Sequence, residues 1–255
     1  MASQTSIKIS ALAICYNEAE HVANYVEQLA FADEVIFIDS YSTDDTVERA
    51  KALGVRVIQR KFDDFSTQRN FALAQATHDW VLFFDLDEEI PEALSCEIQA
   101  LCLEPPVADA FEVRRRFFFF GKFLRFSGWR NDRVVRMFNK HKAQYNGDLV
   151  HEKLLVKGKT ATLKNSLAHY SYTDFDRYNE KLTQYSKLQA QQLYAQGKRP
   201  TCYHFFIRPW YRFWKQYVWQ GGFLDGKAGF IVSYVHAFAV FKRYLQLWMM
   251  YRKIN

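Results

Sequence analysis

Apolar and polar residues alternate along the first half of the chain with two different periods. Four short apolar runs, each bounded by polar or turn-forming residues, are expected to form buried strands. They span residues 7–15, 35–38, 55–58 and 80–84. Between them the apolar side chains recur at helical spacing, as in the stretch from Val22 to Leu29. This alternation is typical of βαβ units and predicts an α/β fold around a largely parallel sheet.

Capping and helix-breaking residues predict where the intervening helices begin and end. Residues 42–45 can cap a helix that Gly54 terminates. Ser66 can cap the next helix, which should reach about residue 76. Pro91 is expected to open the helix that follows the fourth strand, because proline is favoured in the first turn of a helix.

The second half of the chain is less regular. Strands are expected at residues 110–120 and 134–138, and a polar, Gln-rich helix at residues 175–195. A short breaker segment beginning at Gly197 ends that helix. We therefore predict two parts, which are a mixed sheet flanked by helices and a helical appendage. They span residues 1–196 and 197–255.

The appendage differs in composition from the rest of the chain. It contains ten Lys and Arg residues and a single carboxylate, Asp225, whereas the whole chain has a net charge of +6. The appendage therefore carries +9 and the remainder −3, so the basic character belongs to the appendage. It also holds 17 of the 44 aromatic residues. The four cysteines have no paired spacing, which argues against a zinc site or a disulfide framework.

The acidic segment after the fourth apolar run is the strongest chemical signal in the sequence. Residues 81–84 are all apolar and lead directly into Asp85 and Asp87. In open α/β sheets ligands bind beyond the carboxyl ends of the strands, where this pair should lie. Two carboxylates at this spacing can hold Mg²⁺ or Mn²⁺ against a diphosphate, although an isolated Asp-x-Asp is more often a solvated turn.

Four ordered motifs resemble the nucleotide-sugar-binding half of family 2 glycosyltransferases. They lie at residues 15–18 (Cys-Tyr-Asn-Glu), 38–40 (Ile-Asp-Ser), 68–70 (Gln-Arg-Asn) and 84–88 (Phe-Asp-Leu-Asp-Glu). The resemblance covers roughly residues 7–91 and implies the GT-A fold, a single Rossmann-like domain. The joint occurrence of the motifs is more specific than any one of them.

The resemblance also implies roles for individual residues. The loop of Tyr16, Asn17 and Glu18 would bind the nucleotide sugar together with Asp39, and an Asp39 that accepts from a uracil imide would favour a UDP donor. Arg69 would lie near the nucleotide, Asp85 near the ribose, and Asp87 would bind the metal. Without the resemblance, Asp39 is nearly as well explained as a helix-capping carboxylate, and Arg69 as a surface residue.

An inverting transfer needs a base, and we predict Glu152 for this role. A carboxylate near the acceptor can remove the hydroxyl proton as the oxygen attacks the anomeric carbon. The His-Glu context of Glu152 resembles a motif of bacterial lipopolysaccharide inner-core β-1,4-glucosyltransferases, and Asp132 is the competing candidate. His151 and His169 could ligate a metal, although a lone histidine is more often structural.

The appendage is expected to bind a membrane surface and not to cross it. Its longest uncharged stretch, residues 228–241, is shorter than the roughly 20 apolar residues that a span needs. Aromatic residues interleaved with Lys and Arg suit a helix in the plane of the interface, with its cations on anionic lipid phosphates. The alternative is a basic helical subdomain with buried rings. No nucleic-acid-binding module accompanies the basic residues, so we expect no nucleic-acid partner.

The acidic motif and the resemblance to family 2 glycosyltransferases together imply a metal-dependent, inverting hexosyltransferase. We expect it to move glucose from UDP-glucose to a lipid-linked saccharide such as the lipopolysaccharide inner core. The start of the chain shows no secretory signal, so we expect a cytoplasmic protein, peripheral at the inner face of the cytoplasmic membrane. Two rival functions are a nucleotidyltransferase acting on a sugar phosphate and a non-catalytic membrane-docking module. The first would require a Gly-rich phosphate loop after the first strand, which residues 15–18 lack.

Overall fold

The computed structural model describes residues 6–119, 121–130, 132–147, 153–169 and 175–254. The chain forms two compact units. The first comprises residues 1–115 and 133–169, and the second comprises residues 116–132 and 170–255. The first unit is built around a sheet, whereas the second is mainly helical.

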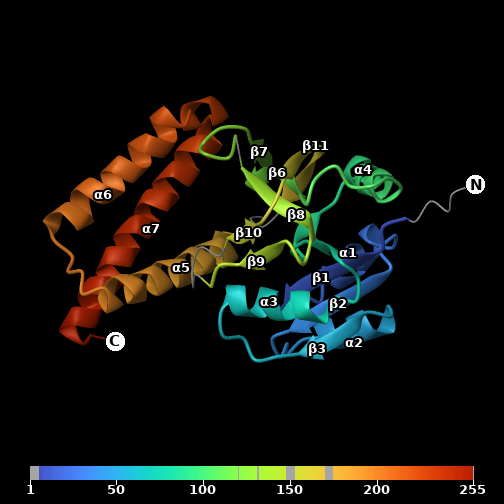
Figure 1. The fold of residues 1–255 in the computed structure, drawn as a ribbon. Helices are drawn as coiled ribbons and strands as arrows, with labels where there is room; N and C mark the ends of the chain where they lie inside the picture. The colour runs from blue at the N-terminus through green and yellow to red at the C-terminus, as the bar shows by residue number, and fades with distance from the viewer. Residues whose placement is uncertain (1–5, 120, 131, 148–152, 170–174, 255) are drawn as a thin grey trace, which may run out of the picture. The chain divides into compact units, whose positions relative to one another are not determined.

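A mixed sheet forms the centre of the first unit (Figure 1). Four parallel strands lie side by side in the order β3 (Arg56–Gln59), β2 (Glu34–Asp39), β1 (Ile9–Cys15) and β4 (Trp80–Phe83). The sheet continues through β8 (Arg133–Asn139), β6 (Ala110–Phe119), β11 (Thr160–His169) and β5 (Glu88–Glu89). β8 is antiparallel to both β4 and β6, and β5 is antiparallel to β11. A separate ribbon pairs β9 (Ala143–Tyr145) with β10 (Leu154–Val156).

Helices cover both faces of this sheet because successive strand residues point to opposite faces. On one face, Ala11 and Ala13 of β1 pack in a core with side chains of three helices. These are α1 (Val22–Gln28), α2 (Thr46–Ala52) and α4 (Glu92–Cys102). On the other face, Leu12 packs in a second core with α3 (Phe65–Gln75). The parallel strands β1, β2 and β4 are therefore largely buried on both sides, which explains their apolar runs, whereas β3 at the edge of the sheet is partly exposed.

The second unit contains three long helices, α5 (Phe175–Ala195), α6 (Cys202–Trp214) and α7 (Lys227–Arg252). A π-helical turn, Lys215–Trp219, and a 3₁₀ turn, Gly222–Asp225, join α6 to α7. At this junction a Cβ atom on Gly229 would lie 1.9 Å from the carbonyl oxygen of Gly222, so the close approach requires glycine. The end of β6 pairs with β7 (Lys122–Leu124) in the same unit. Among the described residues, no helix combines the length and apolarity that crossing a membrane requires.

The predicted α/β class, with a mixed sheet flanked by helices and a helical C-terminal appendage, is confirmed. Two details differ from the sequence analysis. Asp64, and not Ser66, is the N-cap of α3, and its side chain accepts the Thr67 N–H at 2.8 Å. No strand was expected at residues 160–169, where β11 lies inside the sheet. The predicted boundary at Gly197 stays a prediction.

Candidate active site

The strand β4 delivers the acidic motif to the carboxyl edge of the parallel strands. All four of its residues are buried, and Asp85 follows after one further buried residue. The chain then turns back, because the Glu88 N–H donates to the Asp85 carbonyl at 3.1 Å. Within this turn the Asp85 side chain is 27% exposed, Asp87 is half-buried and the Glu88 side chain is fully buried. Three nearby carboxylates therefore have three different environments.

Two arginines hold the Asp85 carboxylate, one on each oxygen. Arg69 of α3 donates to Oδ1 at 2.8 Å, and Arg136 of β8 donates to Oδ2 at 2.6 Å. Arg136 is itself buried, and it also donates to the Phe83 carbonyl at 3.0 Å and to the Glu88 carboxylate. The second Glu88 oxygen accepts the Asp85 N–H at 3.0 Å. The acidic turn is thus attached to a neighbouring strand and to a helix.

Burial and charge act in opposite directions within this cluster. Burial raises the pKa of the Glu88 carboxyl to about 7, although Arg136 favours its charged form. For Arg136, burial lowers the pKa, but the Asp85 and Glu88 carboxylates outweigh burial and raise it above its ordinary value. The guanidinium therefore stays charged and fixes the orientation of Asp85. Neither Arg136 nor Glu88 was predicted from the sequence, although an arginine inside the apolar run of residues 134–138 was a possible signal.

The Asp39 carboxylate lies at the end of β2 and organises the loop that follows. Asp39 is fully buried, and it accepts hydrogen bonds from the Ser42 N–H and hydroxyl and from Gln59 Nε2 at 3.1 Å. It does not cap α2, whose N-cap is Asp45. The structure thus places the Asp39 carboxylate against the loop that follows β2.

The loops after β1 and β2 are joined by reciprocal hydrogen bonds. Asn17 adopts a left-handed backbone conformation with φ of 56°. Its N–H donates to Ser42 Oγ at 2.9 Å, and its side-chain oxygen accepts the Thr43 N–H at 2.8 Å. The Glu18 N–H donates to Thr46 Oγ1 at 2.8 Å. The Tyr16 side chain is 56% exposed beside this joined pair of loops, so its ring is accessible to a planar ligand.

Arg69 lies between aromatic rings as well as against Asp85. Its guanidinium carbon is 5.3 Å from the centroid of Phe83 and 5.4 Å from that of Tyr145, distances at which cation–π attraction is significant. Asn70, the next residue of α3, exchanges two hydrogen bonds with the Tyr145 backbone, at 3.0 and 3.1 Å. These bonds hold α3 against β9 and so fix the backbone position from which the Arg69 side chain extends.

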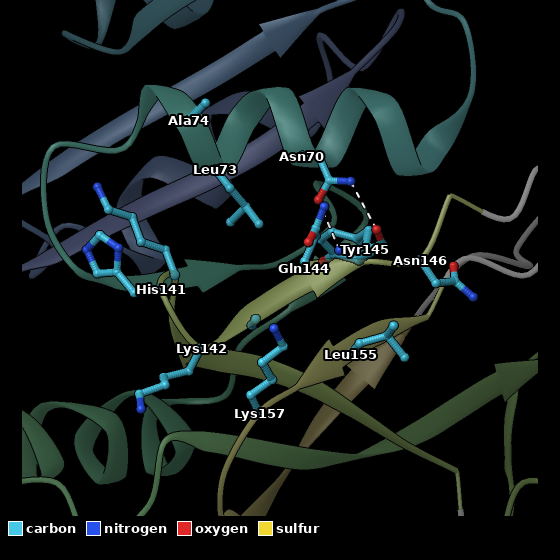
Figure 2. A pocket seen from close by; sticks show the side chains of 12 residues that line it. Asn70, Leu73, Ala74, His141, Lys142, Gln144, Tyr145, Asn146, Leu155 and Lys157 are labelled. Carbon is cyan, nitrogen blue, oxygen red and sulfur yellow. Dashed lines mark hydrogen bonds between the residues drawn. The ribbon is translucent and has the colours of Figure 1, made fainter.

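A groove of about 710 Å³ begins at this contact and follows α3 (Figure 2). Asn70 and Tyr145 lie near one end of it, and Lys142 and Lys157 near the other. Apolar side chains such as Leu73 and Leu155 also line the groove. Leu155 is 57% exposed, so the groove is open to solvent and accessible to a polar ligand.

The residues present fit a divalent cation in part. Asp87 supplies a half-buried carboxylate in the turn, and carboxylate oxygens are the ligands that Mg²⁺ and Mn²⁺ prefer. The antiparallel register pairs the backbone of His169 with that of Glu88, the residue after Asp87. Within the described part of the chain, no three His, Cys, Asp or Glu side chains gather closely enough to form a complete metal site.

The described contacts do not decide between the two candidate bases, Glu152 and Asp132. Glu152, like His151, lies outside the described residues. Asp132 belongs to the second unit, where its N–H donates to the Trp129 carbonyl at 3.1 Å. The choice between Glu152 and Asp132 stays a prediction.

Comparisons with known proteins bear on the same region of the chain. The family profile described as Glycosyl transferase family 2 matches residues 10–170, which include the acidic turn and both joined loops. An uncharacterized glycosyltransferase of Rickettsia felis is 32% identical over 260 residues, which cover 94% of this chain and 89% of the relative. The lipopolysaccharide core biosynthesis glycosyltransferase LpsC of Rhizobium meliloti is 26% identical over 252 residues, 93% of each chain.

One solved structure resembles nearly the whole chain. It is the mannosyltransferase PcManGT from Pyrobaculum calidifontis, in complex with GDP-Man and Mn²⁺. The TM-score is 0.56 over 94% of this chain and 86% of that chain, at 12% sequence identity. At this identity the likeness concerns the fold.

Proposed function

The chain belongs to glycosyl transferase family 2, and we propose that it is a metal-dependent, inverting enzyme that transfers a hexose from a nucleotide sugar to a lipid-linked saccharide. The family match and the likeness to PcManGT confirm the predicted GT-A fold. The observation that carries the proposal is the acidic turn after β4. There Asp85 is held by Arg69 and Arg136, while Asp87 remains half-buried at the strand edge.

The nucleotide of the donor would bind where the loops after β1 and β2 meet. The exposed ring of Tyr16 can cover a planar base, and the hydrogen bonds of Asn17 and Glu18 to Ser42 and Thr46 hold the loop that carries this ring. Asp39 would act mainly by holding this loop, because its carboxylate is buried and accepts from Ser42 and Gln59. UDP-glucose is the donor that we expect.

Asp87 would hold Mg²⁺ or Mn²⁺ at the donor diphosphate, and the sequence offers His169 as a further candidate ligand. When bound, a divalent cation neutralises the charge that develops on the leaving nucleoside diphosphate. Arg69 and Arg136 would position Asp85 near the ribose, and their positive charge compensates the local carboxylates. Glu152 would remove the proton from the acceptor hydroxyl as that oxygen attacks the anomeric carbon.

The acceptor side of the proposal depends on the relatives and on the composition of the appendage. LpsC is described as acting in lipopolysaccharide core biosynthesis, and such an acceptor is anchored in a membrane. The appendage, with ten basic residues and one carboxylate, suits an anionic membrane surface. We therefore propose peripheral binding at the inner face of the cytoplasmic membrane.

A donor screen tests this function. The purified chain is mixed with UDP- and GDP-sugars, with and without Mn²⁺, and the release of nucleoside diphosphate is measured. We expect the highest release with UDP-glucose, its loss in EDTA and its recovery with added Mn²⁺. Asp87→Asn should abolish release while leaving the circular dichroism spectrum unchanged, because it removes a proposed metal ligand and not a core residue.

The matched control is Glu89→Gln, which neutralises an exposed carboxylate two residues away. It should retain release close to that of the wild type. Release that persists in EDTA and in Asp87→Asn would contradict the metal assignment. Formation of inorganic pyrophosphate from a nucleoside triphosphate and a sugar phosphate would instead indicate a nucleotidyltransferase.

A further inference from the structure

The second unit exposes an aromatic groove between α6 and α7. The groove has a volume of about 460 Å³, and all nine residues that line it are apolar or aromatic. They are Pro209, Trp210, Phe213, Trp214, Phe230, Tyr234, Ala237, Phe238 and Phe241. Trp210 and Tyr234 are 62% and 63% exposed. A contiguous exposed apolar surface of this kind marks an interaction site, because single exposed rings are ordinary but grouped ones are not.

Residues at helical spacing on α7 form one side of the groove, and rings of α6 form the other. On α7 its residues Phe230, Tyr234, Phe238 and Phe241 follow the spacing of one helix face. The rings also support one another across the groove. Phe213 of α6 meets Phe230 of α7 edge-on, with their centroids 5.6 Å apart. This aromatic face is therefore already arranged for an apolar ligand.

Two arginines of α6 contact side chains of α7, and Lys242 of α7 lies over the groove residue Phe238, 5.4 Å from its ring centroid. Arg208 donates to the Tyr244 hydroxyl at 2.8 Å, and Arg212 Nη2 lies 3.1 Å from His236 Nδ1. His236 and Tyr244 belong to the stripe of α7 that also holds the buried residue Val240, roughly a third of a turn from the groove stripe. Burial lowers the pKa of the Arg212 guanidinium, which indicates that it faces the interior of the helical unit. Arg208, by contrast, is exposed at the surface.

The appendage has no exposed side-chain carboxylate that would repel a negatively charged surface. Asp225, its single acidic residue, is buried and accepts the N–H groups of Arg125 and Phe126 at 2.9 and 3.0 Å. The exposed cations include Arg208 in the middle of α6, and Lys215, Lys227 and Arg252 near the helix ends. The combination of an apolar groove and exposed cations in the same unit matches the hydrocarbon and the phosphate regions of a lipid layer.

We propose that the aromatic groove between α6 and α7 binds the hydrocarbon chains of membrane lipids, so that the protein attaches to bilayers by ring burial more than by net charge. This inference rests on the proposed function, in which the acceptor is lipid-linked. The aromatic groove is then the surface that contacts the membrane. It also changes the expected response to salt, because burial of rings is not screened by ions whereas attraction between charges is.

Vesicle co-sedimentation over a salt series tests the groove. The full chain is mixed with vesicles of phosphatidylcholine alone and of phosphatidylcholine with phosphatidylglycerol, at about 0.1 M and about 1 M NaCl, where the Debye length falls from about 10 Å to about 3 Å. We expect binding to both vesicle types, and retention of most of it at the higher salt. Trp210→Ser with Phe238→Ser should lower the partition coefficient by roughly a hundredfold, about tenfold for each ring withdrawn from lipid.

The matched control removes two exposed rings of the same unit that do not line the groove, Tyr194→Ser with Tyr203→Ser. It should sediment like the wild type. Replacing Lys215, Lys227 and Arg252 with Gln should reduce only the preference for anionic vesicles. A second measurement needs no variant: lipids brominated on their acyl chains should quench the tryptophan fluorescence of the wild type.

Three outcomes would overturn the proposal. The first is equal sedimentation of the wild type and the groove variant. The second is wild-type binding that disappears at about 1 M NaCl without acyl-chain quenching, since attachment would then depend on charge. The third is a dimer in sedimentation velocity that Trp210→Ser with Phe238→Ser dissociates, without vesicle binding, which would assign the groove to a second copy of the chain. Release of UDP in lipid-free solution reports on the proposed function separately, because the groove variant leaves the acidic turn intact.

Discussion

At the scale of single residues, Asp85 and Asp87 lie two positions apart but have different environments. Asp85 receives one arginine on each carboxylate oxygen, whereas Asp87 lies half-buried in the turn. The difference comes from Arg136, which connects Asp85, Glu88 and the Phe83 carbonyl in the interior of the sheet. Arg136 is therefore a positioning residue whose removal should affect stability as well as activity.

Arg136→Met should lower the free energy of unfolding by about 3–5 kcal/mol, because it leaves buried carboxylates without their cation. Arg133→Met is the matched control on the same strand, since Arg133 pairs with Glu112 in a more exposed position. It should cost at most about 1 kcal/mol. Urea unfolding measures both variants, and equal costs would show that the buried cluster does not depend on Arg136.

Glu152→Gln should reduce the transfer rate by about 10²–10⁴-fold with little change in donor affinity. The amide keeps the size and polarity of the side chain but cannot accept the proton of the acceptor hydroxyl. Transfer kinetics and donor titration measure the two quantities separately. If Asp132→Asn gives this pattern and Glu152→Gln does not, then Asp132 is the base.

At the scale of elements, polar contacts between helices organise the second unit. His236 of α7 connects three partners: its Nε2 is 2.7 Å from the Tyr178 hydroxyl of α5, and its Nδ1 is 2.8 Å from Gln216 Oε1 and 3.1 Å from Arg212. Burial, and then the charge of Arg212, lower the pKa of His236 to about 3. The imidazole is thus neutral in the folded protein at any pH where the protein is assayed.

This pKa predicts acid sensitivity. Between about pH 6.5 and pH 3 an unfolded histidine binds a proton that folded His236 excludes, so its contribution to stability is present above pH 6.5 and is lost as the pH falls. His236→Gln should therefore flatten the fall in Tm between pH 7 and pH 4. Exposed His141→Gln is the control and should leave the slope unchanged. An unchanged slope in His236→Gln would contradict the assignment.

At the scale of the whole molecule, the predicted appendage shares its core with residues that precede it. In one cluster Val232 of α7 packs with Phe117, Phe119 and Tyr178. In another, Ala190 of α5 packs with Val240 and Leu247 of α7. A boundary at Gly197 would therefore pass through two apolar clusters of the second unit.

A chain that ends at Gln196 should expose these clusters. We expect it to bind 8-anilinonaphthalene-1-sulfonate and to aggregate at concentrations where the full chain remains monodisperse, as measured by light scattering. A chain that ends at Arg252 keeps both clusters and is the control. A monodisperse fragment that does not bind the dye would support an independent domain of residues 1–196.

Local patterns were sufficient to predict much of the first unit. The apolar runs ending at Cys15, Ile38 and Phe84 coincide with the parallel strands to within a residue or two. The acidic pair lies at the strand edge where the sequence places it, because all four residues of β4 are apolar and buried and the first polar residue comes directly after the buried run. Such information is carried by neighbouring residues and needs no knowledge of the fold.

Tertiary structure alone decided which partners these residues have. Arg136 reaches Asp85 across 51 positions because β8 enters the sheet antiparallel to β4, and no periodicity in the sequence specifies that pairing. In the appendage the composition predicts a basic, aromatic surface, but the packing of α6 on α7 turns Arg212 inward and leaves Trp210 exposed. Amino-acid composition does not specify which face of a helix is buried, whereas the packing of one helix on another buries one face and leaves the other exposed.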